Sequence, residues 1–123
     1  MLPATTLEVE PTSAGLRLLT EQLTAFAHEH GLPEEVASRL ATVASDVAEV
    51  VAASLDGRLQ ADVDIGVADT QLVVIARDHR LAEVYGSLRP RLDRLGSRCD
   101  GFAAELSSGS ELQVWARFRL ASA

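Results

Sequence analysis

The chain of 123 residues contains neither lysine nor asparagine, and it has a single cysteine, Cys99. Without lysine there is no lysine nucleophile and no P-loop lysine on a phosphate, and without asparagine there is no asparagine ligand for a metal. One cysteine cannot close an intrachain disulfide, and it offers no thiolate cluster for zinc. Enzymes and small scaffolds that depend on these groups are therefore excluded.

Basic charge and long apolar runs are also scarce. No stretch approaches the ~20 apolar residues of a membrane-spanning helix, and residues 1–10 have neither a basic start nor an apolar signal core. The net charge of −7 disfavours nonspecific nucleic-acid binding. All 11 basic residues are arginine and 19 residues are alanine, a bias typical of a GC-rich bacterial genome. We therefore expect a soluble, cytoplasmic protein with protein or small-molecule partners, and with no nucleic acid and no membrane.

The remaining composition suits one globular domain over residues 1–123. With 47% hydrophobic and 24% charged residues, the chain is apolar enough to fold alone. Apolar residues at spacings of three and four predict helices over residues 14–30, 33–55 and 88–99. Thr12 or Ser13 can cap the first helix and Gly31 can end it. Within the second helix we expect Val43, Val47 and Val50 to be buried against a sheet.

Alternation of apolar and polar residues predicts five strands, over residues 5–10, 60–67, 72–78, 102–106 and 112–120. The first strand is expected at a sheet edge, Val67 on the inner face, and a turn at Asp69 and Thr70. Residues 79–87 are expected to form a loop. The element order predicts a two-layer α+β fold, with helices on one face of a mixed, mainly antiparallel sheet.

This order resembles a known fold when it is taken with residues 39–54, the strand end Ala76-Arg77-Asp78 and residues 92–120. It resembles the GHKL, or Bergerat, ATPase fold of gyrase, histidine kinases and anti-sigma-factor serine kinases. Within that group it is similar to anti-sigma regulatory factors of the RsbW type. The resemblance implies a bacterial signalling protein in transcription regulation, whose partner is a sigma factor or an anti-anti-sigma factor. Active relatives use ATP and magnesium.

The second helix departs from the pattern of this family. There the family reads Ser-Glu and then Asn, with the Glu serving a catalytic water and the Asn holding magnesium. Here Ser45 and Asp46 match the start of the pattern. The asparagine position falls at or near Glu49 or Val50, and no asparagine is present to hold the metal.

The adenine and phosphate motifs depart as well. The family motif Asp-x-Gly-x-Gly begins correctly at Asp78 but has Arg80 and Ala82 in place of the two glycines. The phosphate loop is reduced to a short segment with Gly86, whereas a phosphate cradle needs several converging backbone N–H groups. Asp78 has two open roles, as a remnant of the adenine contact or as a cap for the loop after it.

These departures favour a regulatory protein–protein interaction module, a pseudokinase that does not bind ATP. The alternative is an active ATP-dependent serine/threonine kinase anti-sigma factor. In that case Asp46 would be the catalytic base, Asp78 the adenine anchor and Glu49 a magnesium ligand, and Arg89 or Arg91 would attract phosphate. A third hypothesis is a structural dimerisation domain from a degenerate sensor kinase.

Three further groups of residues have simpler interpretations. Asp62 and Asp64 share one strand face, where they could bind a metal, but a solvated outer face explains them better. His28 and His30 diverge by about 200° on a helix and cannot chelate one ion. Cys99 at an apolar helical position is typical of a small core residue rather than a nucleophile.

A partner surface is expected on the sheet face away from the helices. The alternation sends Val73, Ile75 and Trp115 to that face, and tryptophan is among the commonest interface anchors. The strip is predicted to mediate self-association, as in a homodimer, or to bind a protein partner. Its rim is expected to be formed by Asp62, Asp64, Arg77, Arg117 and Arg119. The alternative is that Trp115 merely covers the aliphatic stems of its neighbours.

Overall fold

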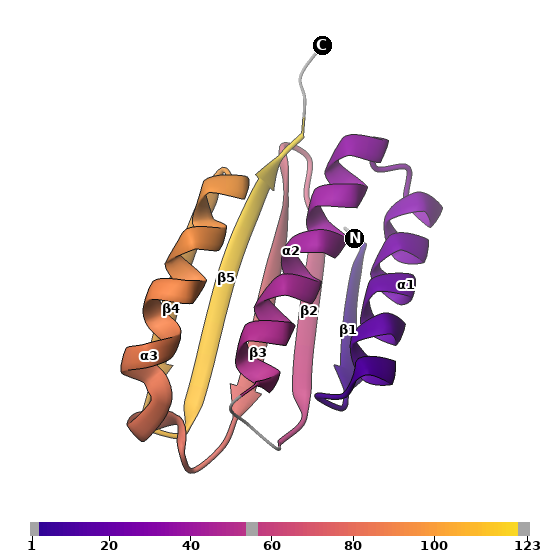
Figure 1. The fold of residues 1–123 in the computed structure, drawn as a ribbon. Coiled ribbons are helices and arrows are strands. Elements are labelled where there is room, and N and C mark those ends of the chain that lie inside the picture. Colours follow the sequence, from indigo (N-terminus) through magenta and orange to yellow (C-terminus); the bar gives the residue numbers. More distant parts are fainter. Residues whose placement is uncertain (1–2, 54–56, 121–123) are drawn as a thin grey trace.

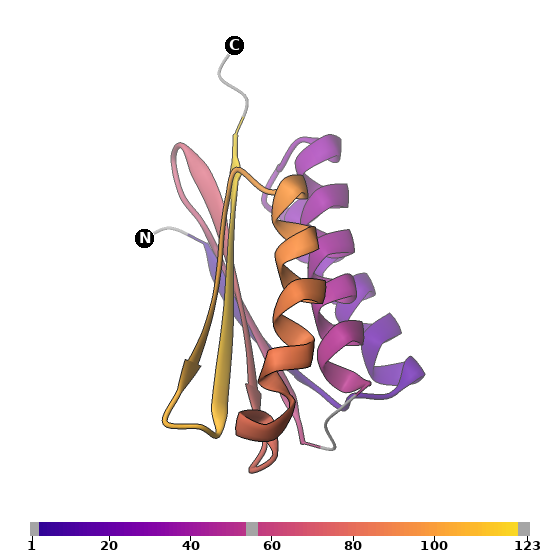
Figure 2. The same ribbon diagram turned by 60° about the vertical axis from the view of Figure 1, so that its left-hand side comes forward.

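The structure, a computed structural model, describes residues 3–53 and 57–120. Within these residues, three helices lie side by side on one face of a five-stranded sheet, and no helix lies on the other face (Figures 1 and 2). The elements in chain order are β1 (Ala4–Val9), α1 (Ser13–Glu29), α2 (Glu34–Ala52), β2 (Leu59–Ile65), β3 (Asp69–Arg77), α3 (Leu81–Asp93), the 3₁₀ turn η1 (Arg94–Arg98), β4 (Gly101–Ser107) and β5 (Glu111–Arg119).

The strand order is β1-β2-β3-β5-β4, and all four pairings are antiparallel. The predicted two-layer α+β fold is confirmed, and β1 lies at a sheet edge as expected. The sheet was expected to be mixed, but no two of the described strands pair in parallel. β3 is the central strand, so β2 and β5 flank it and β1 and β4 form the two edges.

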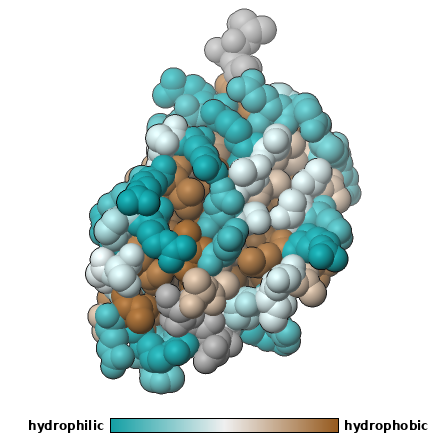
Figure 3. Space-filling view, in the orientation of Figure 1, coloured by the Kyte–Doolittle hydropathy of each residue, from teal (hydrophilic) through white to brown (hydrophobic). Residues whose placement is uncertain are grey.

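The core lies between the sheet and the three helices, with α2, the central helix in Figure 1, in the middle. Val43 and Val47 are fully buried, as predicted, whereas Val50 is only partly buried. Strand residues on the helix-facing side of the sheet, such as Leu72 and Phe118, are buried beneath the helices. Each such side chain contributes about 1.5–3 kcal/mol by leaving water. On the helix side, hydrophobic patches reach the surface only between hydrophilic side chains (Figure 3).

The ends of α1 are fixed by local interactions that the sequence predicts. The Thr12 hydroxyl accepts the Gly15 N–H at 3.1 Å, which caps the helix. Gly31 has a φ of 74°, the left-handed conformation in which a helix commonly ends. Gly15 also lies directly against the Glu10 carbonyl oxygen, where a Cβ atom has no space.

The third helix was placed wrongly by sequence periodicity. The expected loop 79–87 is largely helical, because α3 begins at Leu81 and ends at Asp93, and only the short turn η1 follows. Leu81, Leu88 and Leu92 are buried, so their spacing of seven and four forms the inner stripe of α3. Pro90 lies inside the helix rather than at its start.

Two smaller boundaries also differ. The first hairpin turns at residues 66–68, where the Gly66 N–H bonds to the Asp69 carbonyl at 2.8 Å, and Asp69 already belongs to β3. Val67 is therefore 89% exposed instead of facing the core. The helix predicted over residues 33–55 ends at Ala52, and Leu55 lies outside the described residues.

Candidate functional site

The strand register places Val73, Ile75 and Trp115 on the helix-free face, as the alternation predicts; we call these three residues the apolar strip. Val73 pairs with Trp115 across β3 and β5, and Asp62 of β2 lies on its other side in the same row. Ile75 lies between Gln60 and Gln113 in the next row on this face. The three side chains therefore share one face over adjacent rows.

The indole ring of Trp115 lies against the surface of the sheet, between Gln71 of β3 and Gly101 of β4. Its N–H donates to the Gln71 side-chain oxygen at 3.2 Å. On β4, a Cβ atom built at Gly101 would lie 3.3 Å from the indole Cζ3 atom, so the ring covers that glycine. Ile75 is 9% exposed and Val73 is half-buried. Neighbouring side chains thus cover part of the strip, in line with the alternative interpretation of Trp115, but no helix or second sheet of the described residues covers it.

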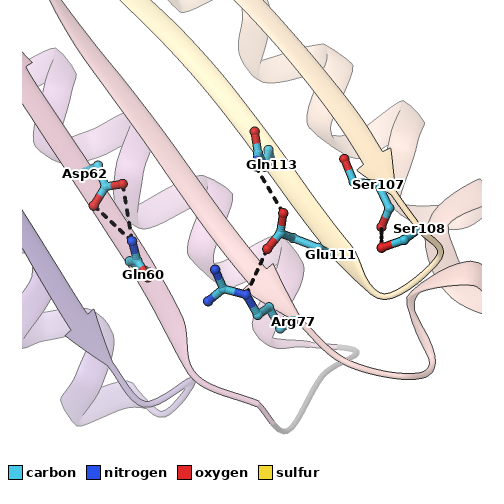
Figure 4. Close-up of polar contacts among 7 residues, drawn as sticks. All are labelled: Gln60, Asp62, Arg77, Ser107, Ser108, Glu111 and Gln113. Atoms are coloured by element: carbon cyan, nitrogen blue, oxygen red, sulfur yellow. Dashed lines mark hydrogen bonds and ion pairs between the residues drawn. The ribbon is translucent and has the colours of Figure 1, made fainter.

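Polar side chains surround the strip in hydrogen-bonded groups. Arg77 Nε donates to Glu111 at 2.8 Å, and the Gln113 amide donates to the other Glu111 oxygen at 3.1 Å. The Gln60 amide donates to Asp62 at 3.2 Å. Figure 4 shows these groups in front of the strands, with the helices behind the sheet.

The outer charges on this face are more weakly partnered. Arg117 Nη1 lies 4.0 Å from Asp69, and its Nε atom is buried without a hydrogen-bond partner within residues 3–53 and 57–120. Asp64 is exposed, and its carboxylate forms no ion pair within 4.0 Å with any of the described residues. An acid on β2 and an arginine on β5 thus flank the apolar strip.

Asp78 lies at the end of β3 with its side chain only 5% exposed. Its carboxylate accepts the Arg80 backbone N–H at 2.8 Å and the Arg80 guanidinium at 3.3 Å. Of the two roles left open by the sequence, these contacts fit a cap for the turn that leads into α3. The arginine that replaces the first motif glycine thus lies on the motif aspartate itself.

Asp46, the acid of the Ser-Asp pair on α2, forms an ion pair with Arg98 of η1. Glu49 is exposed one turn further along the same helix. Arg89, considered for phosphate, donates to Asp93 at 3.0 Å and to Tyr85 at 2.9 Å instead, and both contacts raise its pKa.

A cavity of about 320 Å³ lies between α2 and the segment from η1 to β4, a site that sequence reasoning missed. Asp100 accepts the Arg119 backbone N–H at 2.6 Å and the Arg39 guanidinium at 3.2 Å, and these two bonds hold the pKa of its carboxyl below the usual value. Cys99 packs against the core but is only partly buried, and this burial raises the pKa of its thiol. The lining residues are Ser38, Arg39, Thr42, Val43, Ser97, Arg98, Cys99 and Asp100.

The remaining candidates behave as surface groups. His28 contacts Glu34 at 2.8 Å, and the His30 ring packs against the Phe26 ring in a tilted arrangement, with 4.7 Å between the ring centroids. Within the described ranges no three histidine, cysteine, aspartate or glutamate side chains gather as metal ligands. Across the same residues, the helices are too short or too polar to cross a membrane.

Comparison with known proteins shows the fold. Neither a protein-family model nor a curated protein matches the chain. Among solved structures, the crystal structure of the RsbU and RsbW domains of Rv1364c from Mycobacterium tuberculosis matches 98% of this chain with a TM-score of 0.67 and 15% sequence identity. The match covers 33% of that longer chain. At this identity, the match shows that the two structures share a fold.

Proposed function

We propose that this protein is a regulatory protein–protein interaction module of the RsbW-like, anti-sigma type, which works by contact rather than by ATP chemistry. The contact surface is the apolar strip. The observation that carries this proposal is the half-buried Trp115 of β5, beside the central strand β3, on a sheet face that no described helix covers. Aromatic anchors within a polar rim are typical of protein interfaces.

The contacts of the two candidate nucleotide residues support the absence of ATP chemistry. Asp78 is engaged by the backbone and guanidinium of Arg80, and Asp46 is engaged by Arg98. The first turn of α3 starts at Leu81, which lies within the motif between Arg80 and Ala82, and Leu81 is fully buried. A glycine-rich phosphate loop would have to replace this buried turn. The residues present therefore do not fit magnesium–ATP, and no catalytic step is assigned to them.

The expected partners are a sigma factor or an anti-anti-sigma factor, as the resemblance implies. The test is surface binding of purified host sigma factors and anti-anti-sigma domains, one at a time, to the parent and to Trp115→Asp. We expect one of these proteins to bind the parent and to lose binding to Trp115→Asp. The melting temperature of Trp115→Asp should stay near that of the parent, because Trp115 lies outside the helix-facing core.

Two results would contradict the proposal. If the parent and Trp115→Asp bind the partner equally well, the apolar strip is not the contact surface. Phosphate transfer from labelled ATP to an anti-anti-sigma domain would establish the alternative, an active serine/threonine kinase. The matched control is Leu18→Asp, because Leu18 is a large apolar residue, 44% exposed, on the helix side of the molecule.

A further inference from the structure

The cavity between α2 and the segment from η1 to β4 lies on the helix side of the molecule, away from the apolar strip. Its volume is about 320 Å³, and small-molecule pockets range over roughly 300–1,000 Å³. Figure 3 shows hydrophobic surface recessed between hydrophilic side chains over the gap between α2 and α3. The cavity is therefore large enough for a compact organic molecule.

This cavity is separate from the residues that the resemblance assigns to a nucleotide. Helix α2 contributes lining residues between positions 38 and 43, all of which precede Asp46. Asp78, at the end of β3, lines a different cavity together with Arg77 and Glu111. A ligand held between α2 and η1 would thus not lie where the resemblance places ATP.

Arg39 of α2 has hydrogen-bonding capacity that the fold leaves unused. Its guanidinium makes one hydrogen bond, to Asp100 at 3.2 Å, and lies 5.6 Å above the centre of the Phe118 ring. Its Nε atom is buried without a hydrogen-bond partner among residues 3–53 and 57–120. Stacking on the aromatic ring holds the guanidinium in place, and a buried donor without an acceptor is unfavourable. The arginine is therefore well placed to gain from an additional acceptor.

Other lining groups offer further donors. Arg98 of η1 lines the opposite side of the cavity and uses one nitrogen, Nη1, on Asp46. Ser38 and Thr42 are exposed on α2, and their hydroxyls form no hydrogen bond with the described residues. Val43, which is fully buried, adds an apolar surface. The cavity thus combines two guanidinium groups and two hydroxyls with an apolar wall.

The charge around the cavity favours an anion. Residues 88–100 carry four arginines and two aspartates, a net charge of +2 in a chain whose total is −7. Arg91 and Arg94 are exposed, and neither forms an ion pair with a described residue. A basic segment in an otherwise acidic protein concentrates small anions near itself.

We propose that this cavity binds a small organic monocarboxylate, held through its carboxylate by Arg39 and Arg98 with its apolar part against Val43. The planar guanidinium fork matches the geometry of a carboxylate and can bind both of its oxygens. This inference is independent of the proposed function, because the cavity and the apolar strip lie on opposite sides of the sheet.

Two fixed acids favour a single negative charge on the ligand. Asp100 accepts the Arg39 guanidinium and the Arg119 backbone N–H, and Asp46 pairs with Arg98, so both lining arginines are already partly neutralised. A phosphate monoester carries a charge of about −1.5 to −2 at pH 7, and these carboxylates would repel it more strongly than they repel a monocarboxylate. The site therefore suits a carboxylate better than a phosphate.

The test is a two-dimensional proton–nitrogen NMR titration of the full chain with benzoate as the probe. We expect a dissociation constant of about 1 mM, ordinary for so small a ligand. The backbone amides of residues 38–43 and 97–100 should shift, together with the Nε–H signals of Arg39 and Arg98. Benzamide, which has nearly the same shape but no charge, should bind at least about tenfold more weakly, and phenyl phosphate should also bind more weakly than benzoate.

Variants locate the carboxylate. Arg39→Gln and Arg98→Gln should each raise the dissociation constant for benzoate about tenfold, because each removes one charged donor. Arg17→Gln, which removes an exposed arginine on α1, is the matched control and should bind benzoate like the parent. If Arg39→Gln fails to fold, Arg98→Gln remains informative, because Arg98 is half-exposed and its ion pair adds little stability.

Each other outcome overturns the inference. No shift up to about 20 mM benzoate would show that the cavity is not a carboxylate site. Equal binding by benzamide, tighter binding by phenyl phosphate, or shifts confined to the surroundings of Trp115 would each contradict it as well. A chain that binds benzoate in this cavity but binds no sigma or anti-anti-sigma factor would support the inference and contradict only the proposed function.

Discussion

The Arg98 guanidinium lies against the Asp46 carboxylate and ties η1 to the middle of α2. Asp46 is the acid that the resemblance to RsbW-type proteins would make a catalytic base. Arg98 is 50% exposed and Asp46 is 32% exposed, so solvent screens the pair and its contribution to stability is under about 1 kcal/mol. The pair therefore matters more for where the carboxylate is held than for the stability of the fold.

Arg98→Ala tests whether this ion pair is all that prevents nucleotide binding. We expect a loss of less than about 1 kcal/mol of unfolding free energy. We also expect no rise in melting temperature with magnesium–ATP in the parent, in Arg98→Ala or in Arg80→Gly. All three proteins keep the buried first turn of α3, which the proposed function sets in place of a glycine-rich phosphate loop.

Differential scanning fluorimetry measures this directly, because a ligand at one hundred times its dissociation constant adds about 2.7 kcal/mol of stability. Arg91→Ala serves as the control for removing one exposed arginine. Stabilisation of Arg98→Ala by ATP would show that a competent nucleotide site lies beneath the ion pair.

Val47→Ala tests the burial of α2. Val47 is fully buried, so removing two methyl groups should lower the unfolding free energy by about 1–3 kcal/mol through lost burial and a residual void. Thr42→Ala, at an exposed position of the same helix, should be nearly silent. Urea denaturation followed by circular dichroism compares the two. Equal losses would mean that the helix presents a different face to the sheet.

Two glycines in helices should respond to alanine in opposite directions. At Gly15 a Cβ atom collides with the Glu10 carbonyl oxygen, so Gly15→Ala must shift the backbone, and we expect a loss of more than about 1 kcal/mol. At Gly86, on the exposed side of α3, a Cβ atom meets nothing within 4 Å. Gly86→Ala should therefore stabilise by about 0.5–1 kcal/mol through helix propensity. Urea denaturation followed by circular dichroism measures both changes in stability. If Gly15→Ala stabilises the protein as Gly86→Ala does, the close approach of Gly15 to Glu10 is contradicted.

Strong periodicity made most of the fold predictable. The alternation in β2, β3 and β5 assigned Val73 and Trp115 to the correct face, because one side of each strand is buried and a shift by one residue would expose the core. The capping hydroxyl of Thr12 and the left-handed Gly31 marked the ends of α1. These signals are local, so the sequence contains them in full.

The errors arose where tertiary packing outweighs local preference. The sequence predicted a loop over residues 79–87 and a helix over 88–99, but burial of Leu81 and Leu88 keeps α3 helical from Leu81 through Gly86 and Pro90. The Asp46–Arg98 pair joins residues 52 positions apart, and no periodic pattern predicts it. The Asp100 contacts were missed for the same reason, since Arg39 lies 61 positions away.

Asp100 should make the stability of the protein sensitive to acid. The Arg119 N–H and then the Arg39 guanidinium lower the pKa of its carboxyl, so the folded state binds this proton less readily than the unfolded chain. The unfolded state therefore takes up more protons below about pH 4, and the stabilisation that is present at neutral pH is lost as the pH falls through the folded-state pKa.

Asp100→Asn removes the charge from both hydrogen bonds and should cost about 1 kcal/mol at pH 7. Because the parent carboxyl is itself protonated in strong acid, this difference should close as the pH falls. Urea denaturation between neutral pH and pH 3 measures it, with Glu21→Gln on α1 as the control for losing one exposed negative charge. A gap that stays constant over this range would mean that Asp100 stabilises the β4 and β5 ends by its shape and not by its charge.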